Sequence, residues 1–266
     1  RSSENRSEER SSENRSEERS SENRSEERGS KKIKKMLTVK VFTLYPEIFP
    51  GPLKKGLFGK ALTKKLWDLK VIDIRDFAED KHKTVDDKPF GGGSGMLLRA
   101  DVLSKSIDKN VKQKEKIFYL SPKGKIFDQK KAKQLSNEKV INLICGHFEG
   151  IDERVLEARN IDQISIGDYI LSGGESASFV IIDAVLRLLP GVIGNSSSKI
   201  DESFENDLLE YPQYTKPQIW EKRSVPKVLL SGDHKQIKDW RLSQSEDITR
   251  RLRPDLWKKY LDKEKK

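Results

Sequence analysis

The chain has 266 residues, with 53 Lys and Arg against 43 Asp and Glu, which gives a formal net charge of +10 at neutral pH. A single cysteine, Cys145, excludes an intrachain disulfide, and with only three histidines a structural zinc site is not expected. The longest apolar run, at 179–189, is interrupted by Asp183 and Arg187 and is too short for a membrane span, and the N-terminus lacks a signal-peptide pattern. We therefore expect a cytoplasmic protein with no membrane partner.

The N-terminus consists of the nonapeptide RSSENRSEE repeated three times in succession, followed by Arg-Gly-Ser. This block has no large apolar residue with which to bury a core, so we predict that 1–35 is a disordered tail. A verbatim repeat of this kind is typical of added, non-native sequence, and Met36 is the expected native start. Residues 1–30 carry seven Arg and nine Glu, so the net charge of 31–266 is +12. This charge favours a polyanionic partner, although a lysine-rich solvated surface would look the same.

Strand-like and helix-like patterns alternate through the next part of the chain. Alternating, β-branched or apolar runs predict strands at 37–44, 69–74, 116–120, 140–145 and 163–166. Amphipathic runs predict helices at 53–65, 100–110, 128–135, 152–159 and 176–189, and a polar, glycine-rich loop is expected at 75–95. Strands that alternate with helices predict an α/β domain, assigned to 36–194, with a mainly parallel sheet.

The composition changes after this domain. Residues 195–206 are rich in serine and are expected to form a flexible linker. In the last domain, 207–266, Asp233 is the expected N-cap of a helix to about residue 243, and Pro254 introduces a final helix at 255–262. Residues 213–266 hold 15 Lys and Arg against 8 Asp and Glu, interspersed with tryptophan and tyrosine. Such a small helical domain suits RNA binding, although its tryptophans are more often core residues.

Four glycine-containing turns are the candidate binding elements: PFGGGSGM at 89–96, YLSPKG at 119–124, CGHFEGIDER at 145–154 and IGDYILSGGE at 166–175. Glycine allows the backbone to approach a ligand closely because no Cβ stands in the way. Any one of these turns could instead be a plain tight turn.

Seven segments in order carry a family resemblance: TLYPEIF (43–49), RDFAEDKHKTVDDKPFGGGSGM (75–96), YLSPKG, CGHFEGIDER, SIGDYILSGGE (165–175), LLEYPQYTKP (208–217) and VLLSGDHKQIKDWR (228–241). With these segments the chain resembles the bacterial tRNA (guanine-37-N1)-methyltransferases, which are knotted, SPOUT-class RNA methyltransferases. The resemblance implies S-adenosylmethionine as cofactor, tRNA as substrate and a deep C-terminal trefoil knot in the α/β domain. It also implies a homodimer with active sites shared between subunits, and magnesium as an assisting ion for which no ligand can be named.

The positions that match the family's cofactor pocket lie in three of the turns. They are Tyr119, Leu120, Ser121, Pro122, Gly146, Glu149, Ile166, Gly167, Asp168, Tyr169, Ile170, Leu171, Gly173 and Gly174. Asp168 and Glu149 could equally be capping carboxylates.

Methylation of guanine N1 requires positioning of donor and acceptor, a base for the N1 proton and a cation near O6. Arg187 matches the family's essential arginine, although from spacing alone it could form a helix-face ion pair with Asp183. The family places an aspartate base two residues before the phenylalanine of the linker motif. Here Glu202 stands in that register before Phe204, with Asp201 as the second candidate.

Three other functions remain open at this stage. A related knotted methyltransferase with another RNA target is one, although the VLLSGDH motif argues against it. A non-catalytic RNA-binding protein is another, supported only by the change from aspartate to Glu202. A nucleotide-binding α/β regulator is the third, but no Walker-type Gly-Lys-Ser/Thr pattern supports it.

Overall fold

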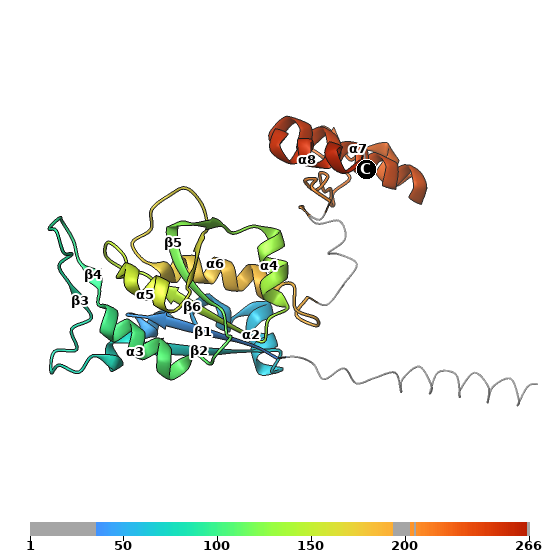
Figure 1. Cartoon of the computed structure of the whole chain (residues 1–266). Coiled ribbons are helices and arrows are strands. Elements are labelled where there is room, and N and C mark those ends of the chain that lie inside the picture. The colour runs from blue at the N-terminus through green and yellow to red at the C-terminus, as the bar shows by residue number, and fades with distance from the viewer. Residues whose placement is uncertain (1–35, 194–202, 205, 265–266) are drawn as a thin grey trace, which may run out of the picture.

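Five parallel strands form the central sheet of the computed structural model, which describes residues 36–193, 203–204 and 206–264 (Figure 1). The strands are β1 (Leu37–Thr43), β2 (Trp67–Asp73), β5 (Ile117–Ile126), β6 (Val140–Cys145) and β7 (Asp162–Ser165), in the spatial order β2-β1-β6-β5-β7. At the centre of the sheet, Val41 of β1 lies opposite Val71 on one side and Leu143 on the other. The predicted parallel α/β sheet is confirmed.

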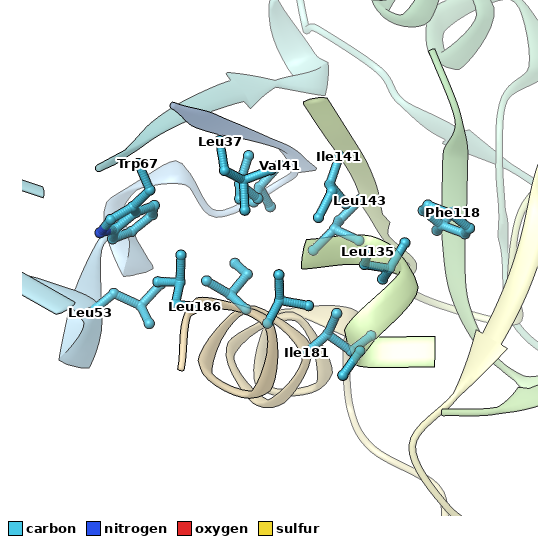
Figure 2. Packing of buried hydrophobic residues seen from close by; sticks show 14 of the residues in the cluster. Leu37, Val41, Leu53, Trp67, Phe118, Leu135, Ile141, Leu143, Ile181 and Leu186 are labelled. Atoms are coloured by element: carbon cyan, nitrogen blue, oxygen red, sulfur yellow. The ribbon is translucent and has the colours of Figure 1, made fainter. Parts of the chain in front are cut away.

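Helices cover both faces of this sheet. Helices α2 (Gly56–Thr63), α4 (Gln129–Ser136) and α6 (Gly174–Leu186) bury their apolar residues in the cluster of Figure 2, and α3 (Ala100–Asn110) and α5 (Glu153–Ala158) bury theirs in a second cluster. Successive strand residues point to opposite faces, so that Leu143 joins the first cluster and Ile144 the second. Because both faces are covered, the strands read as continuous apolar runs.

Strand β5 differs from its prediction. The sequence predicts an end at Ser121-Pro122, but the strand runs on to Ile126. A bulge accommodates the proline, since Leu120 and Lys125 both lie opposite Ile164 of β7. Gly124 lies so close to β7 that a Cβ there would meet the backbone nitrogen of Ile164 at 2.3 Å.

Two helices also differ in extent. The helix predicted at 53–65 begins only at Gly56, because residues Gly51–Lys54 form the 3-10 turn η2. Further along, α7 (His234–Leu252) extends nine residues beyond its predicted end. In that extension Thr249 is buried, donates to the Ser245 carbonyl oxygen and accepts from the Leu209 N–H, which ties the preceding segment to the helix. This contact is tertiary and leaves no signal in the local pattern.

Short elements complete the fold. The two-residue strand β3 (Asp86–Asp87), within the predicted loop, pairs with β4 (Leu97–Leu98), which follows it. The 3-10 turns η1 (Pro46–Ile48), η3 (Ile74–Phe77) and η5 (Lys227–Leu230) connect other elements. The C-terminal residues form the hairpin β8 (Ile219–Trp220)–β9 (Arg223–Ser224), then α7 and α8 (Pro254–Glu264), so the part predicted as all-helical also contains a short β-hairpin. Asp233 caps α7 as predicted, accepting from the N–H groups of Lys235 and Gln236.

The predicted tail, 1–35, and most of the predicted linker, 195–202 and 205, lie outside the described residues. The division into 36–194, 195–206 and 207–266 therefore stays a prediction. Among the helices that the structure describes, none combines the length and apolarity needed to cross a bilayer.

A buried ion pair joins β1 to the segment before β5. The Lys40 ammonium lies 2.8 Å from Glu115 Oε2 and donates to the Asn110 carbonyl at 2.6 Å. Burial acts to raise the pKa of the Glu115 carboxyl, but the hydrogen bond from Lys40 and a backbone N–H lower it below its ordinary value. The pair therefore stabilises the fold above the ordinary pKa of glutamate, and this contribution is lost as the pH falls.

We predict that Lys40→Met lowers the free energy of unfolding by about 2–3 kcal/mol at neutral pH, because it leaves the Glu115 carboxylate buried without its ammonium. The difference from wild type should shrink below about pH 4.3, where glutamate becomes protonated. Urea unfolding at several pH values measures it. The control is Lys116→Met, which breaks an exposed pair with Glu138 and should cost less than about 1 kcal/mol; equal losses in the two variants would contradict the prediction.

Candidate functional site

A cavity of about 520 Å³ opens beside the bulge of β5 and the carboxyl ends of β6 and β7. Its wall comes mainly from three segments, at 119–123, 146–151 and 163–174, with further residues from β4, α5 and α6. The carboxyl edge of a parallel sheet is where α/β proteins bind ligands, and the volume suits a molecule the size of a nucleoside derivative.

Thirteen of the fourteen predicted pocket residues line this cavity: Tyr119, Leu120, Ser121, Pro122, Gly146, Glu149, Ile166, Gly167, Tyr169, Ile170, Leu171, Gly173 and Gly174. Asp168 is exposed and does not line it, although both of its neighbours do. The structure thus brings together three segments that are separated by 11 to 22 residues in the sequence.

The first turn of α6 lies directly on the end of β6. The Gly174 N–H donates to the Gly146 carbonyl at 2.9 Å. A Cβ on Gly174 would meet Cys145 Cα at 2.6 Å, and a Cβ on Gly146 would meet the Tyr119 ring at 2.5 Å. Glycine is required at both positions because the neighbouring backbone and ring occupy the space of any side chain.

A buried polar cluster behind this contact was not predicted. Glu175 is only 5% exposed, and its carboxylate accepts from Thr43 Oγ1 at 2.5 Å. His147 Nε2 lies 2.8 and 2.9 Å from the two carboxylate oxygens. The Tyr45 ring meets the His147 ring edge-on, with centroids 4.9 Å apart. The cluster joins β1, the turn after β6 and α6.

One signal could have identified Glu175. It is the acidic residue in the first turn of α6, where the helix dipole favours a carboxylate. Nothing in the sequence places Thr43 or His147 beside it, since Thr43 lies 132 residues away.

The turn after His147 is strained. Phe148 has φ of 58°, in the left-handed region that non-glycine residues rarely adopt, and Gly150 follows at 127°. Phe148 is half exposed and lines the cavity. The contacts of His147 with Glu175 and Tyr45 hold the residue just before this strained position.

Two titratable groups in this region stay neutral at physiological pH. Burial raises the pKa of the Tyr119 phenol, and the charge of Glu153 raises it further. Burial likewise raises the pKa of the Cys145 thiol well above its usual range. Tyr119 can therefore offer a hydroxyl hydrogen to a ligand, whereas Cys145 is a packing residue and no nucleophile.

The candidate catalytic residues lie elsewhere. Arg187 follows α6 at the end remote from the cavity, roughly 20 Å from Gly174 at 1.5 Å per helical residue. It lines a second, open groove together with Asp183, Ser203 and Phe204. Burial raises the pKa of the Asp183 carboxyl and the nearby charge of Arg187 opposes this, so the two side chains do interact. Glu202 and Asp201 lie outside the described residues.

The cavity suits S-adenosylmethionine in volume and in the chemistry of its lining. Its lining offers apolar side chains such as Leu120, Ile170 and Leu171 for a purine, and the carboxylates of Glu149 and Glu153 for hydroxyl and cationic groups. Glycines at 146, 167, 173 and 174 let the wall segments pack closely, because a Cβ at each position would meet Tyr119, Tyr169, His147 or Cys145 at 2.6 Å or less. Among the described residues, no three His, Cys, Asp or Glu side chains gather as metal ligands.

Comparison with known proteins gives one consistent result. Residues 37–259 match the model of the tRNA (Guanine-1)-methyltransferase TrmD family. A tRNA (guanine-N(1)-)-methyltransferase of Pelagibacter ubique (strain HTCC1062) is 73% identical over 225 residues, which cover 85% of this chain and 99% of the relative. Enzymes of the same name from Bartonella tribocorum and Rhodospirillum rubrum are 55% and 51% identical, over 95% and 94% of their lengths and 83% and 85% of this chain.

We predict that Glu175→Ala lowers the free energy of unfolding by roughly 2–4 kcal/mol, because the Thr43 hydroxyl and the His147 ring lose their buried acceptor. Thermal or urea unfolding measures the loss. Glu153→Ala is the control, since it removes an exposed glutamate that faces the same cavity and should cost less than about 1 kcal/mol. If Glu175→Ala were as stable as this control, the cluster would have no structural role.

Proposed function

The chain belongs to the tRNA (Guanine-1)-methyltransferase TrmD family, and from this premise we propose that it transfers the methyl group of S-adenosylmethionine to N1 of guanine 37 in tRNA, beside the anticodon. The observation that carries the proposal is the cavity walled by three glycine turns, in which thirteen of the fourteen family positions meet. The proposed setting is the cytoplasm, where tRNA is modified.

The cofactor would be held by the three turns. Leu120, Ile170 and Leu171 supply apolar contacts, Tyr119 a hydroxyl and Glu149 a carboxylate. Bound S-adenosylmethionine supplies a methyl group on a sulfonium, which is already a good leaving group. The protein then has to hold the methyl donor and exclude water while the target guanine approaches.

The chain also supplies the groups for the proton. S-adenosylmethionine, held by the three turns, would supply the methyl group, and the N1 proton displaced by methylation would pass to a carboxylate of this chain. We assign that carboxylate to Glu202, with Asp201 as the alternative. Arg187 would offset the negative charge that develops on O6 as the proton leaves.

The position of Arg187 supports an active site shared between two subunits. Within one chain, Arg187 lies at the end of α6 remote from the cavity and shares its groove with Ser203 and Phe204, which follow Glu202 in the sequence. A helix is rigid, so one chain cannot bring both of its ends to the same substrate atom. A homodimer in which the linker of one subunit meets the cavity of the other resolves this separation.

The remaining family features belong to the same proposal. A trefoil knot would form where the chain leaves β7 at the sheet edge and crosses back, so that α6 packs on β6 and β1. The basic domain at 207–266 would hold the tRNA, joined through the linker at 195–206. We propose no residue as a ligand of magnesium.

The reaction is tested with labelled S-adenosylmethionine and tRNA transcripts that carry G or A at position 37. We predict incorporation only with G37, and a decrease of roughly 10²- to 10⁴-fold in kcat for Glu202→Gln, because the N1 proton loses its acceptor. Asp201→Asn is the matched control and should retain most activity. Loss in Asp201→Asn with activity kept in Glu202→Gln would exchange the two roles, and no incorporation into G37 tRNA would overturn the proposed reaction.

The shared site is tested by mixing two inactive variants. Ile170 is 81% exposed and lines the cavity, so Ile170→Arg should block cofactor binding without unfolding the chain. If linker and cavity come from different subunits, co-expression of Ile170→Arg with Glu202→Gln should restore about a quarter of wild-type activity, since half of the dimers are mixed and each has one intact site. If the cavity and the base belong to the same subunit, each subunit of a mixed dimer has one of the two substitutions in its own site. Neither site is then intact, and activity would stay near zero.

A further inference from the structure

The C-terminal hairpin is exposed on all sides. Every residue from 213 to 224 is exposed, including the strand residues of β8 and β9. Two-stranded hairpins are marginally stable when neither face is covered. Ile219 is 63% exposed and Trp220 58%, which is unusual for such large apolar side chains in neighbouring positions.

Trp220 is more exposed than the other tryptophans of the C-terminal part. Trp240 and Trp257 are half buried and pack against the rings of Tyr214 and Tyr260. The sequence alternative, in which these tryptophans form the core of a small domain, therefore fits those two residues and not Trp220.

A guanidinium lies beside the exposed ring. Arg223 is the cross-strand partner of Trp220, and its Cζ is 5.7 Å from the ring centroid. Its contact with Glu221, at 3.4 Å, is long and exposed, so it adds little. An indole face flanked by a guanidinium is the combination on which unpaired bases stack.

The two turn residues that connect Trp220 to Arg223 have a strained backbone. Glu221 and Lys222 both have positive φ, 46° and 63°, as the two-residue turn requires, although glycine or asparagine usually stands there. Strain of this kind at an exposed tip is a mark of a functional segment. Lys222 stands in this turn, between Trp220 and Arg223 in the sequence.

The local charge selects the partner. Residues 213–227 carry Lys216, Lys222, Arg223 and Lys227 against Glu221, a net charge of +3. A second copy would bring an equally positive hairpin, whereas RNA brings phosphates and flat bases.

We propose that Trp220 and Arg223 form a stacking site for an unpaired nucleotide of the RNA substrate, with Lys222 contacting an adjacent phosphate. This inference rests on the proposed function, because it takes the tRNA as the partner. It adds a specific contact surface to a domain that was assigned to tRNA on charge alone. The contact lies in a segment that does not contribute to the cofactor cavity.

The test measures the Kd of the full-length protein for a G37 tRNA transcript at several salt concentrations. Trp220→Leu keeps an apolar side chain but removes the aromatic face, and we expect roughly 10-fold weaker binding with an unchanged salt slope. Trp220→Phe keeps a stacking face and should stay within about 3-fold of wild type. Lys222→Gln should lower the slope by about 1, because it removes a phosphate contact.

Ile219→Ala is the matched control. Side chains alternate along a strand, so Ile219 lies on the opposite face of the hairpin and its loss should leave the Kd within about 2-fold of wild type. An equal loss in Ile219→Ala and Trp220→Leu would overturn the stacking site in favour of a general effect on hairpin folding. Unchanged binding by Trp220→Leu would also overturn it, as would a change of oligomeric state in light scattering, which would assign Trp220 to a subunit contact.

The same titration separates this inference from the proposed function. Wild-type protein that binds no tRNA would overturn the proposed function, and the stacking site with it. If wild type binds tRNA and Trp220→Leu binds it equally well, only the proposed stacking site is overturned. Affinity for S-adenosylhomocysteine, measured by calorimetry, should be the same in all four variants because the hairpin does not line the cofactor cavity.

Discussion

The close approach of α6 to the end of β6 is the constraint on which the rest of the site depends. The Gly174 N–H reaches the Gly146 carbonyl at 2.9 Å, and the backbone at Cys145 leaves no room for a side chain on Gly174. This contact fixes where the 163–174 segment must run to reach α6, and that segment forms much of the cavity wall. A larger residue here would move the helix and the wall together, since packed interiors transmit such displacements.

The buried cluster around Glu175 makes the same junction rigid. Removing a carboxylate from water is unfavourable unless its oxygens are hydrogen-bonded, and here Thr43 and His147 occupy both. The cluster therefore specifies one arrangement of β1, the turn after β6 and the first turn of α6. Phe148, which lines the cavity in a left-handed conformation, follows directly from the residue that this cluster holds. Part of the stability of the fold is thus used to keep a strained binding turn in place.

Helix α6 also separates the two halves of the proposed chemistry. Its first turn belongs to the cavity, whereas Arg187 and the linker residues Ser203 and Phe204 line a groove at its other end. The distance along the helix is set by its length and does not change with side-chain motion. In the proposed mechanism, a second subunit would bring the arginine and a linker carboxylate to the methyl donor. Binding of a large RNA across two subunits would also explain why the residues of the basic hairpin at 219–224 are exposed.

The sequence by itself determined the succession of the five sheet strands and the main helices along the chain, their parallel sheet and thirteen of the cavity residues, because apolar periodicity and glycine turns are local and the family motifs are contiguous. It did not determine the course of β5 through Pro122, the extension of α7 or the burial of Glu175. Each of these depends on a partner distant in sequence: Ile164 for the β5 bulge, Leu209 for Thr249 and Thr43 for Glu175. Local propensity does not report contacts between residues so distant in sequence, so only the tertiary structure decided these three features. The tertiary structure also decided the separation between Arg187 and the cavity that it would serve.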